Sequence, residues 1–170
     1  MLMKRRFAWL AILLTAMILS GCGFHLRGSG DQATLPFKTI YLGAPDASPL
    51  VSALQRYIVG GGGTTVATDA KAAEAILEIM SESKEKVILS LNSQGRVREY
   101  TLNYRVVFRL KNNQNNELLA PTSITIRRTI SFNEAQVLAK EAEETMLYRD
   151  MQSDLVQQML RRIAAIKPTP

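Results

Sequence analysis

The sequence has few of the side chains that usually carry chemistry. Its 170 residues include one cysteine, Cys22, and one histidine, His25. One cysteine cannot form a disulfide within the chain. A lone histidine has neither the partners of a catalytic pair nor the ligand set of a zinc site. The acidic residues fall mainly on expected helix faces and turns, where they are ordinarily solvated. We therefore predict that the protein is not an enzyme and binds no metal or other cofactor.

An apolar run long enough to span a membrane is also missing. The run from Phe7 to Leu19 holds about thirteen residues, whereas a helix that crosses a bilayer needs roughly twenty. Three basic residues precede the run (Lys4–Arg6), and the small residues Ser20 and Gly21 follow it. A positive start, a short apolar run and small residues at the end are typical of a secretory signal peptide. We assign residues 1–21 to this signal peptide.

The only cysteine lies directly after this segment. Leu19-Ser20-Gly21-Cys22 matches the bacterial lipobox, in which the cysteine thiol receives a diacylglycerol and becomes the new N-terminus. An unpaired thiol is a liability in an exported protein, and acylation removes it. Two or more acyl chains anchor a protein stably to a membrane. We predict that Cys22 is the lipid-attachment site and that residues 22–36 form a lipidated anchor and linker.

Charge and length limit what the mature chain can be. Removing residues 1–21 leaves 149 residues, which suffice for one domain with its own core. It also removes three of the 21 basic residues, so 18 remain against 15 acidic ones, a formal net charge of +3. This small excess in an exported lipoprotein argues against nucleic acid as a partner.

Four consecutive glycines, Gly60–Gly63, do not form a phosphate-binding loop. Such a loop requires Gly-Lys-Ser/Thr, whereas Thr64 and Thr65 follow here. The glycines instead end a helix that the apolar spacing predicts over Leu50–Val59. A strand is predicted before it at Phe37–Leu42 and a short returning strand at Thr64–Ala67. This order of strand, helix and strand predicts one β-α-β unit over residues 38–67.

Longer strands are predicted next. The clearest has apolar residues at every second position: Tyr100, Leu102, Tyr104, Val106, Phe108 and Leu110. Before it, Leu77, Ile79, Val87, Leu89 and Leu91 also fit a period of two, interrupted by a charged stretch, 81–86, expected to face solvent. After it, a third strand over Leu118–Phe132 carries Ile124, Ile126, Ile130 and Phe132 on one face. Turn residues at 93–95 and an Asn-rich stretch at 111–117 favour an antiparallel meander.

The chain closes with a predicted long helix, with Asn133 as N-cap and a body from Glu134 to Ile166. Its apolar positions are Leu138, Met146, Leu147, Met151, Leu155, Val156, Met159, Leu160 and Ile163. Crowded acidic residues leave open a break between Glu141 and Thr145. The fold predicted for residues 37–167 is an α+β two-layer sandwich, with two helices packed on one face of a mixed sheet.

The residues after the lipobox resemble a known family. Cys22-Gly-Phe-His-Leu-Arg-Gly28 is similar to the mature start of LptE, the LPS-assembly lipoproteins of the outer membrane. Glu99-Tyr100 and Leu138-Ala139-Lys140 are further local matches, and the order of elements agrees along the mature chain. Gly23 stands where lipoproteins kept at the inner membrane usually carry Asp. The resemblance therefore implies a lipid anchor in the outer membrane.

The resemblance also implies partners. Members of this family sit one-to-one in the lumen of the LptD β-barrel, help it to assemble and take part in delivering lipopolysaccharide (LPS). A barrel lumen is polar, which suits a plug with a charged exterior. The open alternative is a free-standing outer-membrane lipoprotein that binds a periplasmic ligand or tethers an envelope complex.

Candidate LPS contacts come from the basic side chains of the meander, because Arg pairs well with phosphate. The basic residues on its polar face and turns are Arg96, Arg98, Arg105, Arg109, Lys111, Arg127 and Arg128. Relatives often carry a basic residue where Ser93 stands here, so Arg96 or Arg98 would substitute for it. Lys140, in the matching Leu-Ala-Lys segment, is carried over directly. We name Arg96, Arg98 and Lys140 as the LPS contact candidates.

Overall fold

The computed structural model describes residues 34–44 and 48–167. The predicted signal peptide, Cys22 and the family heptad lie outside these residues, so the predicted lipid attachment remains a prediction. None of the helices in the described ranges is long and apolar enough to span a bilayer.

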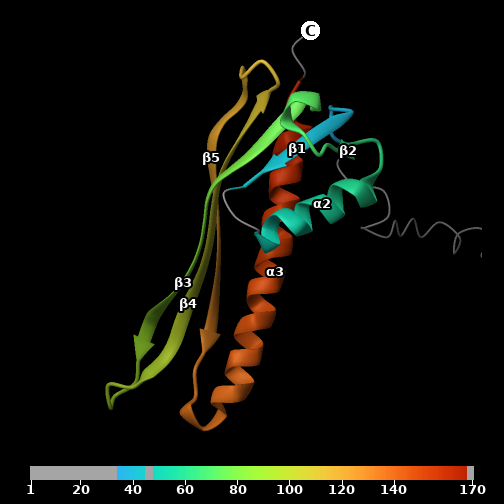
Figure 1. Ribbon diagram of the computed structural model, residues 1–170. Helices are drawn as coiled ribbons and strands as arrows, with labels where there is room; N and C mark the ends of the chain where they lie inside the picture. Colours follow the sequence, from blue (N-terminus) through green and yellow to red (C-terminus); the bar gives the residue numbers. More distant parts are fainter. Residues whose placement is uncertain (1–33, 45–47, 168–170) are drawn as a thin grey trace, which may run out of the picture. The chain divides into compact units, whose positions relative to one another are not determined.

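The described chain is organised around one mixed β-sheet with strand order β2-β1-β3-β4-β5. The strands are β1 (Thr39–Gly43), β2 (Thr65–Val66), β3 (Ala75–Leu91), β4 (Val97–Asn112) and β5 (Glu117–Ser131). β1 pairs in parallel with both β2 and β3, whereas β3, β4 and β5 form an antiparallel meander. The three meander strands are much longer than β1 and β2, so they extend well past them (Figure 1).

The predicted β-α-β unit is confirmed. Helix α2 (Pro49–Gly61) connects the parallel strands β1 and β2, as a parallel pair requires. Ser48 caps its start by accepting a hydrogen bond from the Leu50 N–H at 3.0 Å. Gly62 ends it with a φ of 68°, a value that glycine adopts without steric cost. A short 3₁₀ helix, η1 (Ala70–Ala72), then leads into β3.

Helix α3 (Val137–Ala164) runs along the long strands, whereas α2 lies beside the end of the sheet that holds β1 and β2 (Figure 1). A 3₁₀ turn, η2 (Glu134–Gln136), precedes α3, and the Asn133 side chain caps that turn. The helix is continuous through Glu141–Thr145, so the break that the crowded acidic residues left open there does not occur.

Both helices pack on one face of the sheet and enclose a single core. β4 contributes the alternate residues Leu102, Tyr104, Val106, Phe108 and Leu110, all fully buried. The helices contribute Leu50, Leu54, Ile58, Met151, Leu155, Val156, Met159 and Ile163. The α+β two-layer architecture predicted from the sequence is therefore confirmed, as is the inward face of the central strand.

Two details of the predicted core are wrong. Leu138 and Met146 lie on α3 but are exposed, at 83% and 64%. In β3, Val87, Leu89 and Leu91 do not continue the buried face of Leu77 and Ile79 and are about half exposed. The reason for the second error is the irregularity in the β3–β4 register after Ile79, which shifts the alternation of side chains before Val87; two more follow between Ile88 and Leu91.

Candidate functional site

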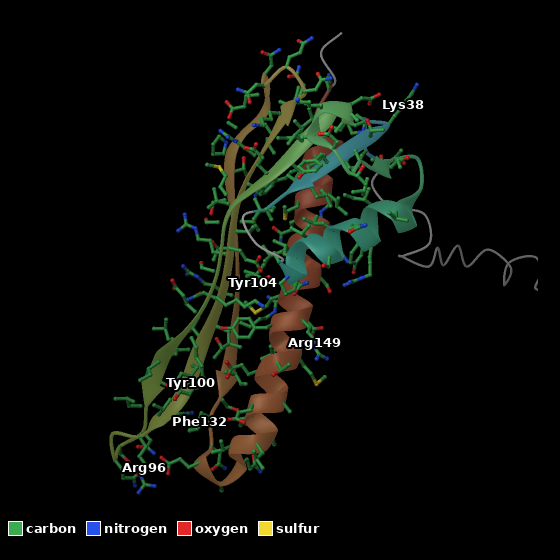
Figure 2. The ribbon with its side chains drawn as sticks, in the orientation of Figure 1. Lys38, Arg96, Tyr100, Tyr104, Phe132 and Arg149 are labelled. Carbon is green, nitrogen blue, oxygen red and sulfur yellow. The ribbon has the colours of Figure 1, made fainter. Side chains whose placement is uncertain are left out.

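The structure brings the three candidate LPS contacts to one end of the sheet. We call this end the basic tip; it consists of Arg96, Arg98 and Lys140 with the turns that carry them. Figure 2 shows Arg96 at the far end of the β3–β4 hairpin, opposite the end that holds Lys38.

The β3–β4 turn projects Arg96 through a compact hydrogen-bond pattern. The Asn92 side chain accepts hydrogen bonds from the N–H groups of Gln94 at 3.0 Å and Arg96 at 2.9 Å. Gly95 takes a φ of 76°, which a side chain would disfavour. The turn therefore has one well-defined shape, and it directs Arg96 into solvent with its side chain 65% exposed.

The start of the last helix meets this turn. The Phe132 N–H donates to the Arg98 carbonyl at 2.8 Å, and the Phe132 ring packs edge-on against Tyr100 at 5.4 Å. Arg96 Nη1 forms an ion pair with Glu134 Oε2 at 3.2 Å. Both side chains of this pair are mostly exposed, so the pair is weak. Arg96 remains available to a ligand.

Lys140 is held from the other side of the same junction. Its ammonium donates to Ser131 Oγ at 3.0 Å and to Glu143 Oε2 at 2.9 Å. The side chain is only 17% exposed, so it is much better ordered by its surroundings than Arg96. Ser131 directly precedes Phe132, whose N–H bonds to the Arg98 carbonyl, so Lys140 and the backbone of Arg98 lie at the same junction.

Exposed apolar side chains accompany the basic tip. Leu89 and Leu91 at the end of β3 are each 54% exposed, and Leu138 at the start of α3 is exposed almost completely. Basic groups can bind phosphate, and the leucines can cover an apolar chain. The tip therefore has the chemistry to bind an anionic amphiphile.

The remaining basic residues of the meander do not share one face. Arg105, Arg109, Lys111 and Arg127 lie on the face away from the helices, because their positions alternate with the buried residues of β4 and β5. Arg128 pairs with Leu102 and lies on the helix-covered face, where it forms an ion pair with Asp154 at 2.5 Å. The predicted single basic face is thus divided between the two sides of the sheet.

On the outer face, Glu78 neutralises two of these cations. Its carboxylate contacts Lys111 Nζ at 2.5 Å and Arg109 Nε at 2.6 Å. The hydrogen bond from Lys111, assisted by that from Arg109, lowers the pKa of Glu78 below its ordinary value of 4.5. Arg109 and Lys111 are therefore engaged in the fold, as Lys140 is through Glu143 and Ser131, whereas Arg96 is the more accessible cation.

The sequence interpretation missed a polar seam between β3 and α3. Five of the residues 81–86 are exposed, as expected, but Glu82 is half-buried and accepts hydrogen bonds from the hydroxyls of Tyr104 and Ser48. Burial, and then the hydrogen bond to Glu82, raise the pKa of the Tyr104 phenol. The residue turns inward because of the irregularity after Ile79, which no composition signal marks.

Two lysines extend this seam toward the tip. Lys84 Nζ lies 4.7 Å from the Tyr104 ring centre and 5.6 Å from that of Tyr148, both within cation–π range. Lys86 Nζ lies 4.4 Å from the Tyr100 ring centre and forms an ion pair with Glu144 at 2.6 Å. These contacts hold β3 against α3 where apolar packing is thin.

The described residues contain no group of three or more His, Cys, Asp or Glu side chains that could hold a metal ion. At the basic tip, Arg96, Arg98 and Lys140 offer charge pairing, and the exposed leucines at this end of the sheet offer apolar contact.

Comparisons with known proteins agree with this architecture. The LptE family model, described as lipopolysaccharide-assembly, matches residues 37–163. A protein from Pectobacterium atrosepticum named LPS-assembly lipoprotein LptE is 28% identical over 169 residues, covering 96% of this chain and 88% of the relative. A protein of the same name from Yersinia enterocolitica is 26% identical over 164 residues, covering 96% and 78%.

Solved structures share the fold. The solution NMR structure of an uncharacterized lipoprotein B from Nitrosomonas europaea has a TM-score of 0.73 and 45% identity, covering 84% of this chain and 91% of that chain. The crystal structure of the rare lipoprotein B from Shewanella oneidensis has a TM-score of 0.64 and 26% identity, covering 75% and 94%.

Proposed function

This chain belongs to the LptE, lipopolysaccharide-assembly, family, and from that premise we propose that it is an outer-membrane lipoprotein that takes part in placing LPS in the outer leaflet. Its relatives are named LPS-assembly lipoproteins, and a role in LPS assembly is the part of the function that these names support most directly. The domain of residues 37–167 would act at the membrane to which an acylated Cys22, after loss of residues 1–21, attaches it.

The observation that carries the LPS assignment is the composition of the basic tip. Arg96 and Arg98 of the β3–β4 hairpin and Lys140 of α3 lie at the same end of the sheet, where Leu89, Leu91 and Leu138 are exposed. LPS combines phosphates with acyl chains, so its phosphates can pair with the basic side chains and its acyl chains can contact the leucines. We assign phosphate contact to Arg96, Arg98 and Lys140.

LPS binding tests this assignment. The double variant Arg96→Asp/Lys140→Asp should bind purified LPS at least about tenfold more weakly, since two charge-assisted contacts are lost. The matched control is Arg56→Glu/Lys71→Glu, which changes the net charge equally at exposed positions of α2 and η1. Circular dichroism should be unchanged in both. Equal LPS affinity for the tip variant and the control would refute the assignment.

The proposed protein partner is the LptD β-barrel, in a one-to-one complex with this chain in its lumen. The outer face of the sheet carries polar residues, among them Arg105 paired with Thr125 and Asn103 paired with Arg127, and such a face suits a polar lumen. Affinity purification of the lipidated chain from detergent-solubilised outer membrane should recover a large β-barrel at near-equal stoichiometry. Recovery of the chain alone would instead support a free-standing lipoprotein that binds a periplasmic ligand or tethers an envelope complex.

The anchor has its own test. Mass spectrometry of the mature N-terminus should show Cys22 as the first residue, carrying acyl chains. An unmodified cysteine, or a chain released freely into the periplasm, would remove the proposed attachment to the outer membrane and with it the plug.

A further inference from the structure

The ammonium group of Lys140 is held by two different parts of the fold. It donates to Glu143 Oε2, three residues further along α3, at 2.9 Å, and to Ser131 Oγ, at the end of β5, at 3.0 Å. An ammonium group has three N–H donors, so one remains for a ligand. Because the Lys140 side chain is only 17% exposed, its torsions have little freedom before any ligand arrives.

The two acceptors affect Lys140 in different ways. Glu143 lies on the same helix and is charged, so it draws the ammonium group along the helix surface and neutralises part of its charge. Ser131 belongs to the sheet and is uncharged. Its hydroxyl therefore ties the ammonium group to the end of β5 and leaves the positive charge intact.

The position that Ser131 gives to Lys140 is fixed relative to the β3–β4 hairpin. The next residue, Phe132, donates its N–H to the Arg98 carbonyl at 2.8 Å. Figure 2 shows Phe132 in the part of the sheet that leads to Arg96. The link through residues 131–132 therefore sets where the Lys140 charge lies relative to the segment that carries the two arginines.

The start of the last helix does not depend on the Ser131 hydroxyl. The Asn133 side chain caps η2 by accepting a hydrogen bond from the Ala135 N–H at 3.0 Å. The backbone hydrogen bond of Phe132 connects this junction to β4. Within the described residues, the Ser131 side chain forms one hydrogen bond, and its partner is Lys140.

We propose that Ser131 is a positioning residue for ligand binding at the basic tip, where its hydroxyl holds the Lys140 ammonium group ready to pair with a phosphate oxygen. A long side chain that is already ordered loses less conformational freedom when it binds. Without the hydroxyl, Glu143 is the acceptor that remains in the described chain, and it draws the charge toward itself. This inference rests on the proposed contact between Lys140 and LPS and adds the residue that sets its geometry.

The affinity of the full lipidated chain in detergent for fluorescently labelled LPS, measured by anisotropy, tests this role. Ser131→Ala should weaken binding about three- to tenfold, as expected when the ligand must order one flexible side chain. Ser131→Thr keeps a hydroxyl and should bind like the parent.

Ser90→Ala is the matched control. Ser90 and Ser131 both pair with Glu99, one from each neighbouring strand, so the two serines lie in the same row of the sheet. The Ser90 hydroxyl donates to the Glu99 carboxylate at 2.6 Å and not to a basic residue. Ser90→Ala should therefore keep the LPS affinity of the parent.

A double-mutant cycle separates positioning from a general structural effect. Lys140→Met removes the ammonium group, keeps most of the apolar stem and should weaken LPS binding at least about tenfold. Adding Ser131→Ala to Lys140→Met should cause no further loss, because the group that Ser131 positions is gone. A loss of the same size in both backgrounds would overturn the proposal.

Two other results would also overturn it: equal affinities for Ser131→Ala and Ser90→Ala, or equal losses for Ser131→Ala and Ser131→Thr. These failures differ from a failure of the LPS assignment itself. If Lys140→Met binds LPS as tightly as the parent, Lys140 is not a contact and both claims fall. If Lys140→Met binds weakly while Ser131→Ala binds normally, only the positioning role falls.

Discussion

Tyr104 joins three elements of the fold through one carboxylate, and removing its hydroxyl tests how that junction is held. The Tyr104 side chain is fully buried in β4, and its hydroxyl donates to Glu82 of β3. The other oxygen of Glu82 accepts from Ser48, the residue that caps α2. Tyr104→Phe therefore weakens the contact between β3, β4 and the start of α2 without changing the ring.

The cost of this change follows from what phenylalanine retains. The ring keeps its edge-on contact with Tyr148 at 6.3 Å and its place beneath Lys84. What is lost is one hydrogen bond to a charged group, which contributes about 1.5–3 kcal/mol. Glu82 is only half-buried, so water can replace the hydroxyl and the lower end applies. We expect a loss of about 1.5 kcal/mol, or a melting temperature lower by roughly 5 °C.

Urea denaturation at neutral pH, followed by circular dichroism, measures this loss. The control is Tyr148→Phe, which removes a hydroxyl bonded to the backbone carbonyl of Glu85 and should cost only about 0.5–1 kcal/mol. In a Glu82→Gln background the effect of Tyr104→Phe should shrink, because the charged acceptor is gone. An unchanged stability for Tyr104→Phe, or equal losses in both backgrounds, would refute the carboxylate as the common partner.

Two further predictions concern stability. Lys111 and Arg109 lower the pKa of Glu78, so its ion pairs stabilise the fold at pH values above the ordinary carboxyl pKa of 4.5. This contribution is lost as the pH falls through the lower pKa of the folded state. Glu78→Gln should therefore be less stable to urea than the parent at neutral pH, and the difference should disappear in acid. Phe108→Ala should lower the free energy of unfolding by about 3–5 kcal/mol, because the side chain is fully buried. Leu138→Ala, at the exposed start of α3, should change it by less than about 0.5 kcal/mol. Comparable losses in the two variants would contradict the core as described.

The parts of the fold that the sequence predicted are those where one physical signal dominates. In β4, five consecutive inward positions are apolar and the residues between them are mostly polar, so only one register buries them all. At Gly62, the helix must end because the chain turns to a positive φ. Both signals are local, and both elements were predicted correctly.

The polar seam could not be predicted in this way. Its geometry depends on how β3 pairs with β4, and one extra residue after Ile79 moves Glu82 and Lys84 from the outer face to the side of the helices. Nothing in the sequence near Met80 marks this irregularity. Charge and family pattern point to Arg96, Arg98 and Lys140, and their contact with LPS stays a prediction. That they lie at one end of the sheet depends on the β5–η2 junction, which sequence spacing does not reveal.

The unequal coverage of the sheet explains where binding surfaces can form. Near β1 and β2, two helices cover the strands, and the core there is apolar and complete. Toward the tip α2 no longer contributes, and the inward positions of β3 become Glu82, Lys84 and Lys86. These side chains replace apolar packing with hydrogen bonds, ion pairs and cation–π contacts. Such contacts keep the strands in place but do not bury the edge of β3 or the leucines beside it. Because polar contacts replace a full apolar core toward this end of the sheet, the basic tip stays accessible to ligands.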